Sequence, residues 1–283
     1  MTKRFYILVA LLALFGLALK TTAADVTKAK KIVLIAGKKS HGPGDHEYEK
    51  GVELLKHSLD TSPNVKGIKT EAYTNGWPTD PKVLENASTI LLFCDGSDHD
   101  EQAHPLLHDD RLATLRRLMK RGVGFVAIHY TVFVPKEKAG NDFLDWIGGY
   151  FDYETGTTPN KWCSAIENKS FSLKPVSLTH PISRGLQPFD LHEELYYHLR
   201  FRPADKRLTP ILSFTPVSHD WDGVVAWAVE REDGGRGFGF TGGHTHKNWE
   251  NPNVRRMVLN ALLWTAKNEV PPQGVESSAN STE

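Results

Sequence analysis

The 283-residue chain is long enough for one large domain or two smaller ones, and its charged fraction of 24% is ordinary for a globular protein. Its 34 basic and 34 acidic residues balance without a basic stripe, which argues against nucleic acid or an anionic membrane as a partner. The two cysteines, Cys94 and Cys163, are too few for a disulfide scaffold or a zinc-thiolate site, and their spacing leaves open whether they pair.

The first 24 residues have the pattern of a secretory signal peptide. Lys3 and Arg4 precede an apolar run over residues 5–19, and residues 21–24 supply small side chains for cleavage. The run is shorter than the ~20 residues that a membrane-spanning helix needs, so a cleaved leader is favoured over an uncleaved anchor. We therefore expect a bacterial protein exported to the periplasm or beyond, with no membrane span after cleavage.

The first half of the remaining chain alternates strand and helix patterns. Apolar runs predict strands at residues 31–36, 70–73, 89–94 and 121–128. Helical periodicity predicts helices at residues 49–59 and 111–120. This order predicts an α/β fold in which a central, mostly parallel sheet carries helices on both faces.

The second half is less regular. Its predicted elements are a short helix opening at 143, a strand near 162–166, a turn-rich connection at 180–189, strands at 209–214, 224–230 and 237–241, and a helix at 253–266. Residues 232–236 read as a hairpin turn between the last two strands. Pro, Gly, Ser and Asn after Val270 favour a disordered tail over residues 271–283. No composition shift marks a boundary within residues 25–270, so we expect a single domain there.

The central predicted strand ends on a titratable side chain. Residues 124–128 are apolar on both faces, as in a strand covered by helices on both sides, and His129 and Tyr130 follow directly. In open parallel sheets, ligands bind beyond the carboxyl ends of the strands. A histidine in this place is also compatible with a hydrogen-bonded core or loop residue.

Three further clusters carry titratable residues. They are the loop at 40–48, the stretch at 192–198, and the glycine-rich strand and turn at 237–246. The loop matches neither the P-loop nor the dinucleotide fingerprint, and the second stretch is not a His-Glu-x-x-His motif. A solvated loop or a charged turn is the plain alternative for each. Because the ends of parallel strands meet at one edge of a sheet, we favour a shared functional site.

The clusters, in this order, resemble the ThuA-like family, which is named for trehalose utilisation. The matching stretches span nearly the whole mature chain: residues 40–48, 124–130, 145–149, 180–182, 193–197 and 235–244. The resemblance implies one flavodoxin-like domain, similar to the class I glutamine amidotransferases, with an exported form that looks most like those of planctomycete-type bacteria. The chain departs from the family pattern at Glu193, where Asp is expected, so Glu194 is the matched acidic position.

The resemblance also bears on chemistry. The central strand of the amidotransferases ends in a nucleophilic cysteine, whereas this chain has His129 there, so acyl transfer from an amide loses its nucleophile. Cys94 ends a different strand and reads as a small buried hydrophobe. The family implies metabolism of sugars oxidised at a ring carbon, such as 3-keto-glycosides, beside a sugar dehydrogenase that produces them.

We expect His41, His129 and His244 to hold a divalent cation, zinc or manganese, which would polarise the carbonyl oxygen of such a sugar. The residues expected to transfer protons, in an isomerisation or an elimination, are Glu194 with Tyr196 or His246 as partner. The residues expected to contact the sugar are His46, Tyr130 and Trp249, with core packing as the alternative for the tryptophan. Two other functions stay open: a non-catalytic carbohydrate-binding protein, and a metal-dependent hydrolase of glycosidic or ester bonds.

Overall fold

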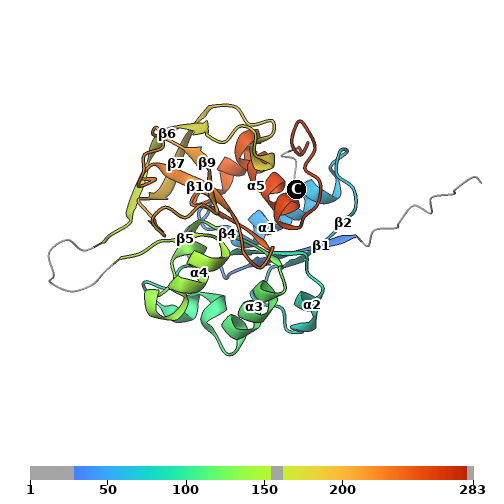
Figure 1. The fold of residues 1–283 in the computed structure, drawn as a ribbon. Coiled ribbons are helices and arrows are strands. Elements are labelled where there is room, and N and C mark those ends of the chain that lie inside the picture. Colours follow the sequence, from blue (N-terminus) through green and yellow to red (C-terminus); the bar gives the residue numbers. More distant parts are fainter. Residues whose placement is uncertain (1–28, 154–161, 279–283) are drawn as a thin grey trace, which may run out of the picture.

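The computed structural model describes residues 29–153 and 162–278, so the predicted signal peptide lies outside the described residues. A nine-stranded sheet crosses the molecule, in the order β2-β1-β3-β4-β11-β10-β9-β6-β7 (Figure 1). Its strands are β1 (Lys30–Ala36), β2 (Ile68–Tyr73), β3 (Thr89–Phe93), β4 (Gly124–Ile128), β6 (Ala165–Pro175), β7 (Phe189–Tyr197), β9 (Leu208–Ser213), β10 (Val224–Glu230) and β11 (Arg236–Phe240). Strands β5 (Gly149–Tyr150) and β8 (Arg200–Phe201) form a separate pair.

The sheet is parallel in its first half and antiparallel in its second. Strand β1 pairs in parallel with β2 and β3, and β4 pairs in parallel with β3 and β11. From β11 onward the pairing is antiparallel, beginning with the β10–β11 hairpin, whose turn contains Gly234 at a φ of +76°. The predicted α/β sheet is therefore confirmed, with an antiparallel extension beyond β11.

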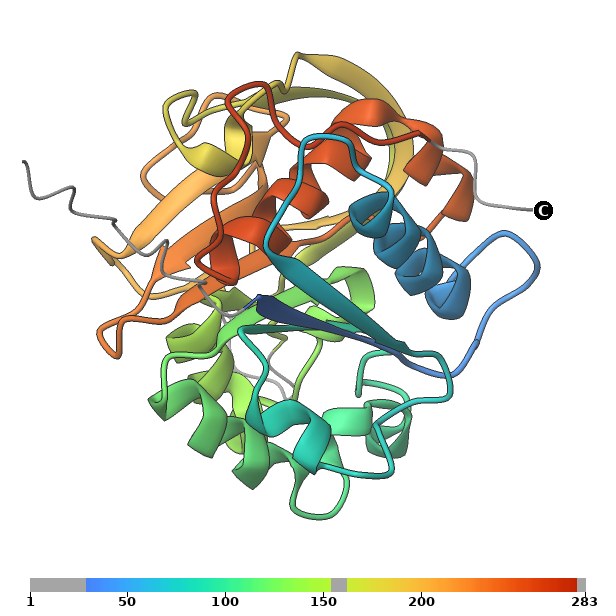
Figure 2. The same ribbon diagram turned by 90° about the vertical axis from the view of Figure 1, so that its right-hand side faces the viewer.

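Helices cover both faces of the parallel half (Figures 1 and 2). Helices α1 (Tyr48–Asp60) and α5 (Pro252–Thr265) pack on one face, and α2 (Lys82–Glu85), α3 (Arg111–Lys120) and α4 (Asn141–Trp146) lie on the other. Every residue of β3 and β4 is buried, because helices exclude water from both sides. Short turns of 3-10 helix occupy Glu101–Ala103, Pro105–Leu107, His129–Val132, Pro181–Ser183 and His246–Glu250, and Lys136–Gly140 is a π-helix.

The segment after Val270 packs against the domain. Val275 is fully buried, and its N–H donates to Oδ1 of Asn260 at 2.8 Å. The prediction of a disordered tail is therefore wrong for residues 271–278, because apolar valines among the Pro and Gly residues anchor the chain on α5. Residues 279–283 lie outside the described residues.

The two cysteines do not pair: Cys94 is buried directly after β3, and Cys163 is exposed. Burial raises the pKa of the Cys94 thiol, which fits its interpretation as a small hydrophobe. None of the helices in the described ranges combines the length and apolarity that crossing a bilayer requires.

Candidate functional site

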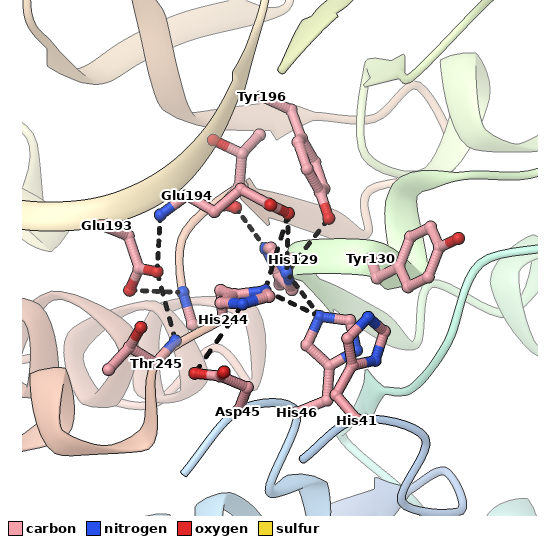
Figure 3. A network of polar contacts seen from close by, with 12 residues as sticks. His41, Asp45, His46, His129, Tyr130, Glu193, Glu194, Tyr196, His244 and Thr245 are labelled. Carbon is pink, nitrogen blue, oxygen red and sulfur yellow. Dashed lines mark hydrogen bonds and ion pairs between the residues drawn. The ribbon is translucent and has the colours of Figure 1, made fainter. Parts of the chain in front are cut away.

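Three histidines from distant parts of the chain meet at the carboxyl edge of the parallel strands (Figure 3). His46 lies in the loop after β1, His129 follows β4 directly, and His244 follows β11. Nε2 of His46 lies 3.1 Å from Nε2 of His129 and 2.9 Å from Nδ1 of His244. All three side chains are buried or nearly so. We call them the histidine trio.

The backbone is held in uncommon conformations to bring these rings together. His46 has a φ of +48° and His129 a φ of +52°, and a side chain in this region costs on the order of 1–3 kcal/mol. Gly243, at a φ of +113°, makes the turn before His244, and the N–H of His46 donates to the carbonyl of His244 at 2.9 Å. The surrounding structure therefore fixes a strained arrangement, which is typical of functional sites.

In two of the three rings, the nitrogen that faces away from the trio lies within hydrogen-bonding distance of an acceptor. Nδ1 of His129 donates to the carbonyl of Thr241 at 2.7 Å, and Nδ1 of His46 lies 3.2 Å from Oδ1 of Asp95. Nε2 of His244 lies 3.7 Å from Oδ1 of Asp45. When the outer nitrogen of a neutral ring carries the proton, its inner nitrogen carries a lone pair.

The inner nitrogens of the three rings face one another. The hydroxyl of Tyr196 reaches His129 at 3.0 Å, but no side chain among the described residues donates to the inner nitrogens of His46 and His244. Burial, and then the nearby histidines, push the pKa of His129 well below its ordinary value, and burial also lowers the pKa of His244. Three neutral imidazoles whose ligand nitrogens lie within 4.8 Å of one another could hold a metal ion.

Strand β7 adds a carboxylate and a phenol to the trio. Oε1 of Glu194 lies 3.6 Å from Nδ1 of His244 and 3.8 Å from Nε2 of His129. The ring of Tyr196 stacks on that of His129, with centroids 4.7 Å apart, and burial followed by the charge of Glu194 raises the pKa of Tyr196 well above its ordinary value. Both residues line a pocket of about 380 Å³ that reaches the trio at His46.

Glu193 points the other way, as alternation along a strand requires. It is 1% exposed, and its carboxylate accepts from the N–H groups of Glu194, Thr245 and Gly243 and from the side-chain amide of Asn248, at 2.9 to 3.3 Å. Burial raises the pKa of Glu193 to about 7, against these donors. Glu193 therefore fixes the turn that carries His244.

Comparisons with known proteins agree with this architecture. The family model described as ThuA, trehalose utilisation, matches residues 32–265. The chain belongs to this family. Among curated proteins, no significant match is found.

Two solved structures of ThuA-like proteins share the fold of this ThuA-family chain at low identity. A ThuA-like protein from Bacteroides uniformis is 15% identical, with a TM-score of 0.58 over 87% of this chain and 94% of the other. A ThuA-like protein from Parabacteroides merdae is 14% identical, with a TM-score of 0.56 over 89% and 98%. A glutamine amidotransferase from Thermotoga maritima is 9% identical, with a TM-score of 0.44 over 85% and 99%.

The two histidines of the loop at 40–48 lie side by side in the ThuA-family site, with ring centroids 3.7 Å apart. His41, predicted as a metal ligand, lines the pocket and forms a second group with His46 and Asp95 that could also hold a metal ion. His46, predicted to contact the substrate, lines the pocket and is also part of the trio, and its positive φ turns its ring inward. Tyr130 lines the pocket as expected, with its hydroxyl donating to Asp98.

Two further predicted residues lie away from the pocket. Trp249 is 1% exposed and packs edge-on against Phe93, so it offers no face to a sugar; the prediction that it contacts the substrate is wrong, and core packing holds. The N–H of His246 donates to the carbonyl of Gly44, and burial, then Lys50, lowers the pKa of its ring. His246 does not line the pocket that holds Glu194.

The interpretation of the sequence missed Asp95 and Asp98, which follow β3 and line the pocket. Burial opposes ionisation of Asp95, but hydrogen bonds from His46, Ser40 and Tyr48 outweigh it and lower its pKa. Their position in the sequence could have indicated this role, because both acidic residues follow the strand that neighbours β4 in the sheet.

Proposed function

We propose that this ThuA-family protein is a metal-dependent enzyme that transfers protons on a carbonyl sugar of the 3-keto-glycoside type. The observation that carries the proposal is the histidine trio, whose buried lone pairs converge beside Glu194, Tyr196 and a pocket. Family membership supports carbohydrate utilisation as the context.

The trio suits a divalent cation of the zinc or manganese type. His46, His129 and His244 would hold it through their inner nitrogens, with Asp95, the Thr241 carbonyl and Asp45 orienting the rings from outside. When bound, such a cation supplies Lewis-acid polarisation of a carbonyl oxygen, which acidifies the adjacent C–H bond.

Glu194 is the proposed base. It is partly exposed to the pocket, and its carboxylate can take a proton from the carbon next to a carbonyl and return it to a neighbouring atom. The raised pKa of Tyr196 keeps its hydroxyl protonated, so it can donate a hydrogen bond or a proton to the oxygen that gains charge. Returning the proton to a different carbon gives isomerisation, and loss of a neighbouring substituent gives elimination.

The proposed substrate must itself be formed by oxidation of a glycoside. A ring carbonyl on a glycoside must be introduced by an oxidoreductase, so we propose that a sugar dehydrogenase supplies the substrate. The leader pattern in residues 1–24 supports export, and we propose that the reaction takes place in the periplasm or outside the cell.

Solvent exchange tests the proton transfer. We expect zinc-loaded or manganese-loaded protein to introduce deuterium from D₂O next to the carbonyl of methyl 3-keto-glucoside, as followed by NMR. Glu194→Gln should slow exchange by about 10²–10⁴-fold, as loss of a general base does. Glu85→Gln is the matched control, because Glu85 is partly exposed and pairs with Arg117 and Arg121 far from the pocket.

The proposal is wrong if exchange does not exceed that in buffer, or if Glu194→Gln exchanges as fast as the parent protein. Release of methanol without exchange would instead favour the hydrolase.

A further inference from the structure

The pocket beside the histidine trio is acidic. Four of the residues that line it carry carboxylates, namely Asp95, Asp98, Asp100 and Glu194. The side chains of Asp95, Asp98 and Glu194 are 14%, 20% and 23% exposed, so these three face the pocket without being open to bulk water. Among the described residues that line the pocket, none is lysine or arginine. The nearby Lys39 is paired with Glu47 at 2.6 Å.

Two of these carboxylates keep an oxygen for a ligand. Ser40, Tyr48 and His46 all meet Oδ1 of Asp95, and no donor among the described residues meets its Oδ2. Asp98 likewise receives the hydroxyl of Tyr130 on Oδ1, while among the described residues only the exposed His99, at 3.6 Å, pairs with its Oδ2. Free carboxylate oxygens accept hydrogen bonds from hydroxyl groups and repel anions.

An aromatic wall completes this arrangement. Tyr130 is half-buried, and a Cβ on Gly96 would lie 2.6 Å from its ring, so the absence of a side chain at Gly96 lets the ring stand close to the backbone. The ring of Phe133 packs edge-on against Tyr130 at 5.0 Å and holds it in place. A fixed phenol face beside carboxylates suits a ligand with C–H and O–H groups, as a sugar ring has.

We propose that this pocket selects uncharged polyhydroxy compounds and rejects their phosphate and carboxylate derivatives, with Asp98 as the specificity-determining residue at its mouth. The inference rests on the proposed function for the identity of the sugar, and it names the substrate class of that site. The four carboxylates that line the pocket outweigh one divalent cation held by the trio, so the selection persists in the metal-loaded protein.

The charge of the pocket can be measured without any substrate. Ala103 lines the pocket, so Ala103→Cys in a Cys163→Ser background introduces a reporter thiol there, while Cys94 is fully buried and protected. We would compare its reaction rates with methanethiosulfonate reagents that carry an ammonium or a sulfonate group. The exposed Cys163 of the parent protein is the reference, and both thiols are measured at pH 8.

We expect the ratio of the ammonium to the sulfonate rate to be at least about tenfold higher at the pocket thiol than at Cys163 in zinc-loaded protein. Asp98→Asn should lower this ratio at least threefold. Asp110→Asn, which removes the same charge at an exposed helix start without a side-chain cap, should leave it unchanged. A ratio equal to that at Cys163, or one that Asp98→Asn does not change, would overturn the inference.

Calorimetry then tests selection directly. Methyl 3-keto-glucoside should bind at least about tenfold more tightly than its 6-phosphate, and Asp98→Asn should reduce this difference in affinity. Equal binding of both compounds overturns the selection while leaving the proposed function standing. If neither compound binds, the proposed function fails, and the thiol ratio alone decides the charge of the pocket.

Discussion

Replacing Glu193 by alanine should damage both stability and metal affinity, although Glu193 does not touch the pocket. The substitution leaves four N–H donors without their acceptor, and the donor on Gly243 is buried. An unsatisfied buried donor costs ~1–3 kcal/mol, and water can serve the less buried Thr245 and Asn248. We therefore expect a loss of about 2–4 kcal/mol in the free energy of unfolding.

The same substitution frees the turn that carries His244. Loss of an outer partner of a metal-binding residue typically weakens metal affinity by ~10–100-fold, and we expect a loss in that range for zinc. Urea unfolding at pH 6, below the raised pKa of Glu193, measures the stability effect, because the stability linked to this buried carboxyl is lost as pH rises through 7. Competitive zinc titration at pH 8 measures the metal affinity.

Glu85→Ala is the control, because Glu85 forms its ion pairs with Arg117 and Arg121 at the surface, where such pairs contribute little to stability. If Glu193→Ala kept zinc affinity within twofold of the parent protein, the assignment of Glu193 as a positioning residue would be refuted.

Three other predictions concern the fold. Burial lowers the pKa of His104 to about 4, below the ~6.5 of an unfolded histidine, so the stability that His104 contributes above pH 6.5 is lost, by up to about 3 kcal/mol, as pH falls through 4. The free energy of unfolding of His104→Asn should fall less over that pH range. If it fell as steeply as in the parent protein, the burial of a neutral His104 would not explain the acid sensitivity. Gly237→Ala places a Cβ 1.9 Å from the carbonyl oxygen of Trp146 and should lower the free energy of unfolding in urea by more than about 2 kcal/mol. Gly42→Ala, with open space around the new Cβ, should not lower it. Equal effects of the two substitutions would refute the packing argument. Ending the chain after Val270 removes the buried Val275 and should lower the free energy of unfolding by about 2–4 kcal/mol. Ending it after residue 278 should leave the melting temperature unchanged. Equal melting temperatures of the two truncated proteins would show that residues 271–278 do not stabilise the fold.

The parallel half of the fold was predictable because each strand carries its own apolar run. The pattern of residues 124–128 alone indicates a strand covered on both faces, and burial of all of β4 confirms it. The meeting of His129 and His244 also follows from topology, since parallel strands end at one edge. These inferences needed only periodicity and chain order.

The details that the sequence could not predict depend on local backbone conformation. Which of His41 and His46 turns inward is decided by a positive φ that no residue pattern announces. The roles of Glu193 and Glu194 depend on the face that each presents on β7, and that is fixed by pairing with β6 across the sheet. The burial of Trp249 likewise follows from a single turn of 3-10 helix placed against α1 and α5.

Metal content tests the central claim most directly. Protein purified without chelator would be analysed for metals beside the His129→Ala/His244→Ala double variant and a His57→Ala/His219→Ala control, whose histidines lie outside the trio. We predict close to one zinc or manganese ion per chain in the parent and the control, and its loss in the trio variant. Absence of metal from all three after titration with zinc and manganese, or equal metal in the trio variant, would contradict the account.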